Sequence, residues 1–241
     1  MRIDAHFHVG TCRVFDRDVS DQEVLDTHEG WDVVVVQPYP GAPDPAATHD
    51  RIADLGKRTG GRVRGLASLS PHRDRDEYFA EIDRCVNQLG FVGIKLHTIG
   101  HALNPMSTDG ATVFEAGREF GVPVMIHTGP GIPFADPGMA APRARQFPDV
   151  TIILAHAGWS IFSGSAIAVA EQYDNVYLEP SWCRVSDIVP MVSRVGAGRI
   201  MFGSDDARNI QPELARYEAA GLSAGDLDRI LGGTAAEVFR L

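Results

Sequence analysis

The chain has 241 residues, of which 44% are hydrophobic and 22% are charged, and its formal net charge is −10. This length and apolar content suit one sizeable core, and the acidic balance disfavours nucleic acid as a partner because phosphate binding depends on lysine and arginine. No apolar run approaches the roughly 18 residues that cross a bilayer, and no signal-peptide pattern opens the chain. The three cysteines are scattered, so we expect a reducing, cytoplasmic location and no membrane partner.

Short, β-rich apolar runs recur along the chain at the spacing of one strand–helix unit. Several are almost continuously apolar, which is typical of parallel strands buried on both faces. Eight such strands, each followed by helical material, predict an α/β protein with the (β/α)8 architecture of a TIM barrel, as one domain over residues 1–241. An open doubly wound sheet is the alternative, but no G-x-G-x-x-G motif follows the first run. The runs are residues 2–8, 32–37, 63–70, 91–97, 122–129, 150–158, 175–180 and 199–205.

Helical patterns fill the gaps between these runs. Residues 76–90 and 111–121 carry a helical apolar face, and each pattern ends at a glycine. Two further helices are expected to begin with capping boxes, at Ser20 and at Thr234.

Two long loops rich in glycine and proline, residues 38–48 and 128–142, follow the second and fifth runs. Loops after strands lie at the carboxyl end of a barrel, where active sites form. Each loop is therefore a candidate lid or wall, with a plain connection as the equally weighted alternative.

Polar residues gather where the predicted strands end. Because side chains alternate along a strand, Lys95 shares a face with His97, and Phe7, between two histidines, should point outward to the helices. Asp205 ends the eighth run, which neighbours the first in a closed barrel. A single histidine here is more often a satisfied strand-edge residue, but the set favours a metal site, since imidazole and carboxylate bind divalent transition metals. The strand-end histidines are His6, His8, His97, His127 and His156.

Five motifs, D-A-H-F-H, G-I-K-L-H, P-V-M-I-H-T-G, I-L-A-H-A-G and F-G-S-D, occur in this order. Together they resemble the amidohydrolase superfamily, and most closely the branch with aminocarboxymuconate semialdehyde decarboxylase, related aromatic-acid decarboxylases and pyrone dicarboxylate hydrolase. The resemblance runs from His6 to Phe239. It implies that His6, His8, His127 and Asp205 bind one divalent ion, zinc first, with manganese, cobalt or iron as alternatives.

The resemblance also implies roles in catalysis. His156 would contact the substrate or move protons, and Asp205 would act as general base toward an attacking water while it touches the metal. Lys95 and His97 would contact the substrate. In two-metal members, a lysine on the fourth strand is carbamylated and bridges the ions, so a second ion with carbamylated Lys95 is the less favoured alternative.

Several loop residues are candidates for the substrate pocket. Arg13 and Arg208 follow the first and eighth runs and could clamp a substrate carboxylate. Trp159 and Trp182 could wall the pocket. Loop packing is the alternative for all four, and nothing marks Cys183 as an activated nucleophile, so we interpret it as packing.

The combination predicts a metal-dependent hydrolase for a small, carboxylated or cyclic substrate such as a lactone, ester or amide. A non-oxidative decarboxylase using the same metal site is the alternative, although the short chain and Thr234, where relatives often have asparagine, depart from that branch. A TatD-type deoxyribonuclease expects glutamate where this chain has Lys95. A non-enzymatic barrel would have broken ligand positions, and here all are filled. The resemblance suggests a homodimer.

Overall fold

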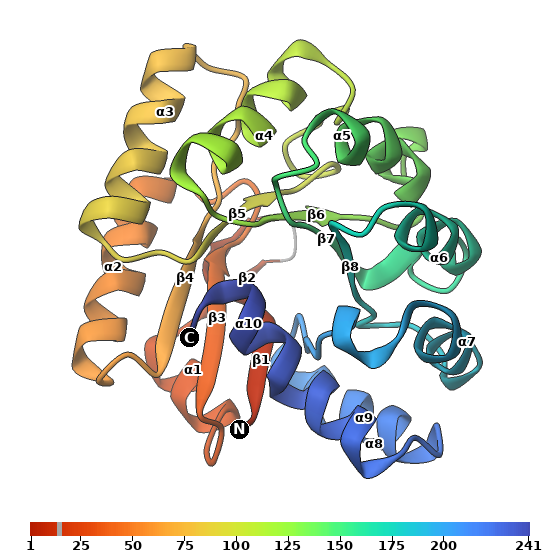
Figure 1. The fold of residues 1–241 in the computed structure, drawn as a ribbon. Coiled ribbons are helices and arrows are strands. Elements are labelled where there is room, and N and C mark those ends of the chain that lie inside the picture. The colour runs from red at the N-terminus through yellow and green to blue at the C-terminus, as the bar shows by residue number, and fades with distance from the viewer. Residues whose placement is uncertain (14–15) are drawn as a thin grey trace.

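The computed structural model describes residues 1–13 and 16–241, which form one sheet surrounded by helices (Figure 1). The sheet has the order β2-β1-β3-β4-β5-β6-β7-β8, in which β2 pairs antiparallel with β1 and every other pair is parallel. The TIM-barrel architecture predicted from the sequence is confirmed, and β2 is an extra hairpin strand. The strands are β1 (Ile3–Cys12), β2 (Arg17–Val19), β3 (Val33–Pro38), β4 (Val63–Ala67), β5 (Gly93–Leu96), β6 (Val124–His127), β7 (Ile152–Ala155) and β8 (Val176–Glu179).

Helices alternate with the strands along the chain. Figure 1 shows the strands in the middle of the view, with helices around them and α10 crossing over them. No helix in the described residues is both long enough and apolar enough to cross a membrane. The helices are α1 (Asp21–Thr27), α2 (Pro45–Arg58), α3 (Arg75–Asp83), α4 (Thr108–Phe120), α5 (Ala141–Gln146), α6 (Ser163–Gln172), α7 (Val185–Val195), α8 (Ile210–Ala219), α9 (Ala224–Asp228) and α10 (Thr234–Phe239).

The predicted eighth barrel strand, residues 199–205, is not a continuous strand. It closes the barrel between β8 and β1 through two isolated bridges, which pair Ile200 with Leu178 and Asp205 with Phe7. The expectation of a regular strand is wrong because this segment bonds alternately to its two neighbours and then leaves the sheet, with Asp205 in the left-handed region at φ 65°.

Side chains reinforce this seam between residues 199–205 and β1. The backbone N–H and the hydroxyl of Ser204 both donate to the buried carboxylate of Asp4. At Gly203, an added Cβ would come within 2.6 Å of the Glu179 carboxyl carbon, so the close approach requires glycine. The seam is thus held by specific side chains in place of a full ladder.

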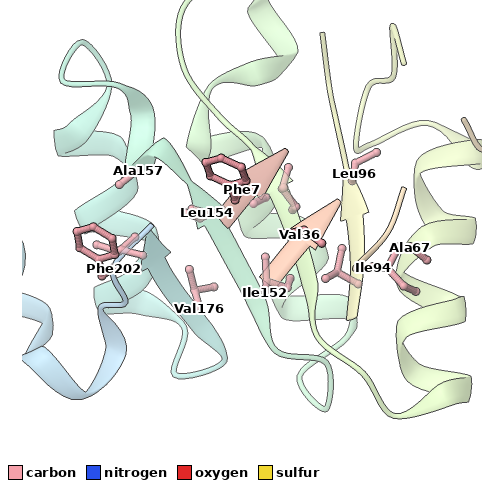
Figure 2. Close-up of a cluster of buried hydrophobic side chains, with 14 of the residues drawn as sticks. Phe7, Val36, Ala67, Ile94, Leu96, Ile152, Leu154, Ala157, Val176 and Phe202 are labelled. Atoms are coloured by element: carbon pink, nitrogen blue, oxygen red, sulfur yellow. The ribbon is translucent and has the colours of Figure 1, made fainter. Parts of the chain in front are cut away.

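The core has two parts. Inside the barrel, a cluster that includes Leu66, Met125 and Met201 is covered at one end by Phe239 of α10. Outside the barrel, a larger cluster lies between strands and helices, and Figure 2 shows part of it. Phe7 belongs to this outer cluster, as the alternation along β1 predicts.

Helix α1 forms half of its predicted capping box, because the N–H of Glu23 donates to the Ser20 hydroxyl at 3.1 Å while the Glu23 carboxylate pairs with Arg17. Helix α10 begins at Thr234, but the capping box predicted there does not form. A π-helical turn, Arg229–Gly233, runs directly into α10, and the Thr234 hydroxyl donates to the Ala197 carbonyl instead. The capping-box pattern from Thr234 to Glu237 therefore lies within a continuous run of helical turns and not at its start.

His49 of α2, Glu81 of α3 and Cys85, which follows α3, lie close together outside the barrel. His49 Nε2 accepts the Ser68 N–H at 3.0 Å, so the ring proton lies on Nδ1 and is donated to Glu81 Oε1 at 2.7 Å. Cys85 Sγ lies 3.3 Å from His49 Nδ1. Because His49 Nδ1 carries a proton, we interpret His49, Glu81 and Cys85 as a hydrogen-bonded cluster and not as a metal site.

Glu81 should make a pH-dependent contribution to stability. Burial alone would raise its pKa, but hydrogen bonds from His49 and Arg84 lower it to about 2. A carboxyl whose pKa is depressed by folding stabilises the protein above its unfolded pKa, and this contribution fades as the pH falls toward the folded value. Glu81→Gln should therefore lower the free energy of unfolding by about 1–3 kcal/mol at pH 7.

Urea titrations at pH 7 and pH 3 would measure this effect, with the exposed Glu77→Gln on the same helix as control. The loss should be clearly smaller at pH 3. An equal loss at both pH values would contradict the ion-paired state of Glu81.

Candidate metal centre

The predicted ligands of β1 and of the seam meet at the carboxyl end of the barrel. His6 Nε2 and His8 Nε2 each lie 3.3 Å from Asp205 Oδ1. His6 is fully buried and His8 nearly so, whereas the Asp205 side chain keeps 21% of its surface exposed. Asp205 therefore stands between two buried imidazoles and the solvent.

The hydrogen bonds of the two imidazoles determine which nitrogen carries the proton. His6 Nδ1 lies 2.6 Å from Glu179 Oε2, and His8 Nδ1 lies 3.3 Å from the Pro38 carbonyl. Both partners are acceptors, so each Nδ1 is the donor and each Nε2 presents a lone pair. The two lone pairs and the Asp205 carboxylate oxygen then converge on one point, with Lys95 Nζ and the Gln37 side-chain nitrogen as the neighbouring donors to the two Nε2 atoms. A divalent cation would satisfy these three acceptors together.

His127, the fourth predicted ligand, lies beside this set and not within it. Its ring stacks on His97, with centroids 4.2 Å apart, and its centroid lies 4.8 Å from that of His156. Both of its ring nitrogens are buried without a hydrogen-bond partner. Because buried polar atoms are rarely left unpaired, these two nitrogens fit a ligand bound here.

Glu179, at the end of β8, was missed in the sequence analysis. It is fully buried, it accepts from His6, and its Oε1 accepts the Ser181 N–H at 2.7 Å. Its Oε2 also accepts the Ser181 hydroxyl, and that hydroxyl lies 2.8 Å from His156 Nδ1. The carboxylate thus orients two histidines of the site. The sequence carries a pattern that could have identified Glu179, because the apolar strand β8 ends in this charged residue where other strands end in histidine.

Lys95 reaches into the same centre from β5. Its Nζ lies 2.9 Å from His6 Nε2, and the side chain is almost fully buried. Burial lowers the pKa of Lys95, against the opposing effect of Asp205 and Glu179, and burial raises the pKa of Glu179. Lys95 therefore contacts the inner side of the ligand set.

The electrostatics keep the ligands in the protonation states that metal binding requires. Burial lowers the pKa of His6, His127 and His156 well below the usual value. Burial would raise the pKa of Asp205, but the surrounding imidazoles, His156 first, lower it well below its usual value. Neutral imidazoles and an ionised carboxylate are the forms that ligate metals.

A strained segment shapes one side of the centre. Residues 156–160 all have positive φ, and four of the five are not glycine. Left-handed backbone at such residues costs about 1–2 kcal/mol each, and strain of this kind clusters at functional sites. The segment carries His156 at its start and exposes Trp159, which stacks on Trp182 with ring centroids 5.8 Å apart. The two tryptophans thus pack together beside His156, and their role as the wall of a substrate pocket stays a prediction.

The two long loops of the carboxyl face differ in structure. Tyr39, in the loop 38–48, stacks on His8 with ring centroids 4.7 Å apart, so this loop lies against the predicted ligand set. The loop 128–142 is partly helical, because it contains 3-10 turns at Pro133–Ala135 and Pro137–Ala140. Cys183 is buried, and burial raises the pKa of its thiol to about 12, which agrees with a packing role.

The predicted arginines lie outside the metal set. Arg13 is exposed at the end of β1, next to residues 14–15, which lie outside the described part of the chain. Arg208 is exposed and donates to both oxygens of Asp206. Arg17, which the sequence analysis did not single out, pairs with the same carboxylate and with Glu23. Arg17 and Arg208 line a cavity of about 580 Å³ together with Asp16 and Glu23.

Comparisons with known proteins show which enzymes this chain is similar to. The chain is 26% identical over 236 residues to the 2-keto-4-carboxy-3-hexenedioate hydratase of a Sphingobium strain, covering 78% of this chain and 68% of that protein. It is 25% identical over 245 residues to a Polaromonas gamma-resorcylate decarboxylase, covering 80% and 75%. A Polaromonas dihydroxybenzoic acid decarboxylase, solved with bound manganese and an inhibitor, shares the fold with a TM-score of 0.75 and 19% identity, over 100% of this chain and 97% of that one.

The family model described as amidohydrolase matches residues 3–241. That span includes β1 with its two histidines and the seam that carries Asp205. With a barrel of this topology and a convergent set of metal-ligand atoms at its carboxyl end, the chain belongs to the amidohydrolase family and is an enzyme of its amidohydrolase-2 branch.

Proposed function

We propose that the chain is a metal-dependent enzyme that adds water to a small carboxylated substrate, by hydrolysis of a lactone, ester or amide or by hydration of a double bond. The observation that carries the proposal is the convergence of His6 Nε2, His8 Nε2 and Asp205 Oδ1, with each nitrogen 3.3 Å from the carboxylate oxygen. Buried, unpartnered His127 supplies further ligand atoms next to them. A divalent ion bound here would polarise the substrate oxygen and acidify a water molecule.

Two residues are proposed to handle protons. Asp205 is ionised and partly exposed, so it is suited to accept a proton from the attacking water. His156 has its Nδ1 engaged by Ser181, which leaves Nε2 free to exchange a proton with the substrate. Both groups come from strand ends around one point, as a proton relay requires.

Other predicted residues are proposed to bind the substrate. Lys95 and His97 would contact it from the β5 side. Arg208 and Arg17 line the cavity beside the site, and they would bind a substrate carboxylate there in exchange for their ion pairs with Asp206 and Glu23. Arg13 is a further candidate from the neighbouring loop. The names of the hydratase and decarboxylase relatives are consistent with a carboxylated small molecule.

We propose one ion per chain, because His6, His8 and Asp205 form one compact ligand set and Lys95 already contacts His6. Zinc is the ion that the sequence favours, and manganese is present in the related decarboxylase structure. A second ion held by carbamylated Lys95 is the alternative that metal analysis distinguishes.

A decarboxylase is the second candidate, because one curated relative is a gamma-resorcylate decarboxylase. In that reaction a proton replaces the carbon dioxide on the substrate carbon, and His156 would deliver this proton through Nε2 after taking it from solvent. The ligand set would be the same, so the two candidates differ only in the fate of the substrate.

The test uses the purified full chain, stripped of metal by a chelator and then reloaded with zinc or manganese. Lactones, unsaturated dicarboxylates and hydroxybenzoates would be screened in ¹⁸O-labelled water. Stripping should lower activity by at least about 100-fold and reloading should restore it, with one equivalent of metal per chain and ¹⁸O in the product. Carbon dioxide release without ¹⁸O would establish the decarboxylase instead, and full activity after stripping would overturn both.

A further inference from the structure

The two oxygens of the Asp205 carboxylate lie in different environments. Oδ1 faces His6 and His8, whereas Oδ2 accepts the indole N–H of Trp182 at 2.9 Å. An indole N–H is only a donor, so this hydrogen bond has one direction and one partner. The carboxylate can therefore present only one of its oxygens to the histidines.

The backbone of Trp182 is fixed from the opposite side. Its N–H donates to Glu213 Oε1 at 2.6 Å, and its φ of 68° is left-handed, which an aromatic residue rarely adopts. Glu213 is fully buried on α8, where it also pairs with Asn209 and Arg216. A residue held in strained backbone by a buried carboxylate is not free to turn its side chain elsewhere.

The indole of Trp182 is also supported on its face. It stacks on Trp159 with an interplanar angle of 27°, and Trp159 comes from the strained segment 156–160. Strain in two separate segments therefore brings the two rings together beside Asp205. A tryptophan used only for packing would not require strained backbone both at its own position and in the segment that carries its stacking partner.

We infer that Trp182 is a positioning residue for Asp205, which rests on the proposed function. By holding Oδ2, the indole fixes the rotation of the carboxylate, so that Oδ1 alone points toward the ion and toward the water that Asp205 deprotonates. Without this hydrogen bond the carboxylate rotates, and the acceptor facing His6 and His8 is no longer held in place. Metal affinity and turnover should then fall together, while substrate affinity changes little.

Trp182→Phe tests this inference, because it keeps a ring to stack on Trp159 and removes only the N–H donor. Metal affinity would be measured by competition with a chelator, and kcat and KM would be measured separately. We expect metal affinity to fall about 10–100-fold and kcat to fall with KM unchanged within about twofold. Trp31→Phe, which makes the same change in the outer core cluster, is the matched control and should keep the metal affinity of the unaltered protein.

The metal-free forms provide the control for folding, since the midpoint of thermal unfolding of metal-free Trp182→Phe should match that of the unaltered protein. The unaltered protein provides a test independent of any variant. The chain has three tryptophans, so ¹⁵N-labelled indole gives three N–H signals. The Trp182 signal should be protected from exchange with water, unlike that of the exposed Trp159, and should shift when metal is added.

Metal affinity and kcat equal to those of the unaltered protein in Trp182→Phe, or an unprotected indole signal that metal does not shift, would overturn the inference. Failure of the proposed function looks different: the unaltered protein itself would bind no metal, or His6→Ala would bind it equally well.

Discussion

Replacing Asp205 with asparagine is expected to abolish turnover, with a loss of at least about 10²–10⁴-fold in kcat. The amide keeps the shape of the carboxylate but not its charge. Because Trp182 donates to Oδ2, the amide oxygen would take that position and the NH₂ group would face His6 and His8. A donor would then replace an acceptor at the centre of the ligand set, which lowers metal affinity as well as removing the base.

Elemental analysis after dialysis and steady-state kinetics would measure both effects of Asp205→Asn. Asp149→Asn is a suitable control, because Asp149 is exposed and pairs only with Arg118 among the described residues. Full metal content together with full activity in Asp205→Asn would disprove its role in the site.

Glu179→Gln is expected to have the second largest effect. Glu179 accepts from both His6 Nδ1 and the Ser181 N–H, and it has no exposed surface. Glutamine can offer an oxygen to only one of these donors. If its NH₂ faces His6, the imidazole proton moves to Nε2, and the metal-binding lone pair is lost. If its NH₂ faces Ser181, two buried donors oppose each other.

The expected result for Glu179→Gln is a fall in metal affinity of about 10–100-fold and a loss of about 1–3 kcal/mol in the free energy of unfolding of the metal-free protein. Chelator competition and urea titration measure the two quantities. Glu171→Gln, an exposed residue paired with Arg194, should change neither. An unchanged metal affinity in Glu179→Gln would show that His6 does not depend on this carboxylate for its orientation.

The sequence predicted the barrel because its signals are local. Apolar runs of the right length and spacing specify buried parallel strands, and alternation along β1 is enough to direct His6 and His8 inward and Phe7 outward. The irregular seam was not predictable in the same way. Residues 199–205 read as a strand, but hydrogen bonds from Ser204 to Asp4, about 200 residues away, determine their path.

The candidate site was partly predictable for the same reason. Strand ends identified His6, His8 and Asp205 as neighbours, since closure brings the first and last strands together. The role of Glu179 depends on a contact across 173 residues, and that of Trp182 depends on a left-handed backbone that Glu213 holds. The capping box predicted at Thr234 does not form because the preceding turn, Arg229–Gly233, is already helical, and the capping motif gives no information about that turn.

The incomplete ladder at the seam links the closure of the barrel to the metal. His6 and His8 belong to β1 on one side of the seam, and Asp205 belongs to the segment on the other. An ion bound by all three residues would connect β1 to residues 199–205, where the barrel has only isolated backbone bridges. Part of the free energy of metal binding would then stabilise the closed barrel. Metal binding and closure of the barrel between β1 and residues 199–205 would therefore be thermodynamically coupled.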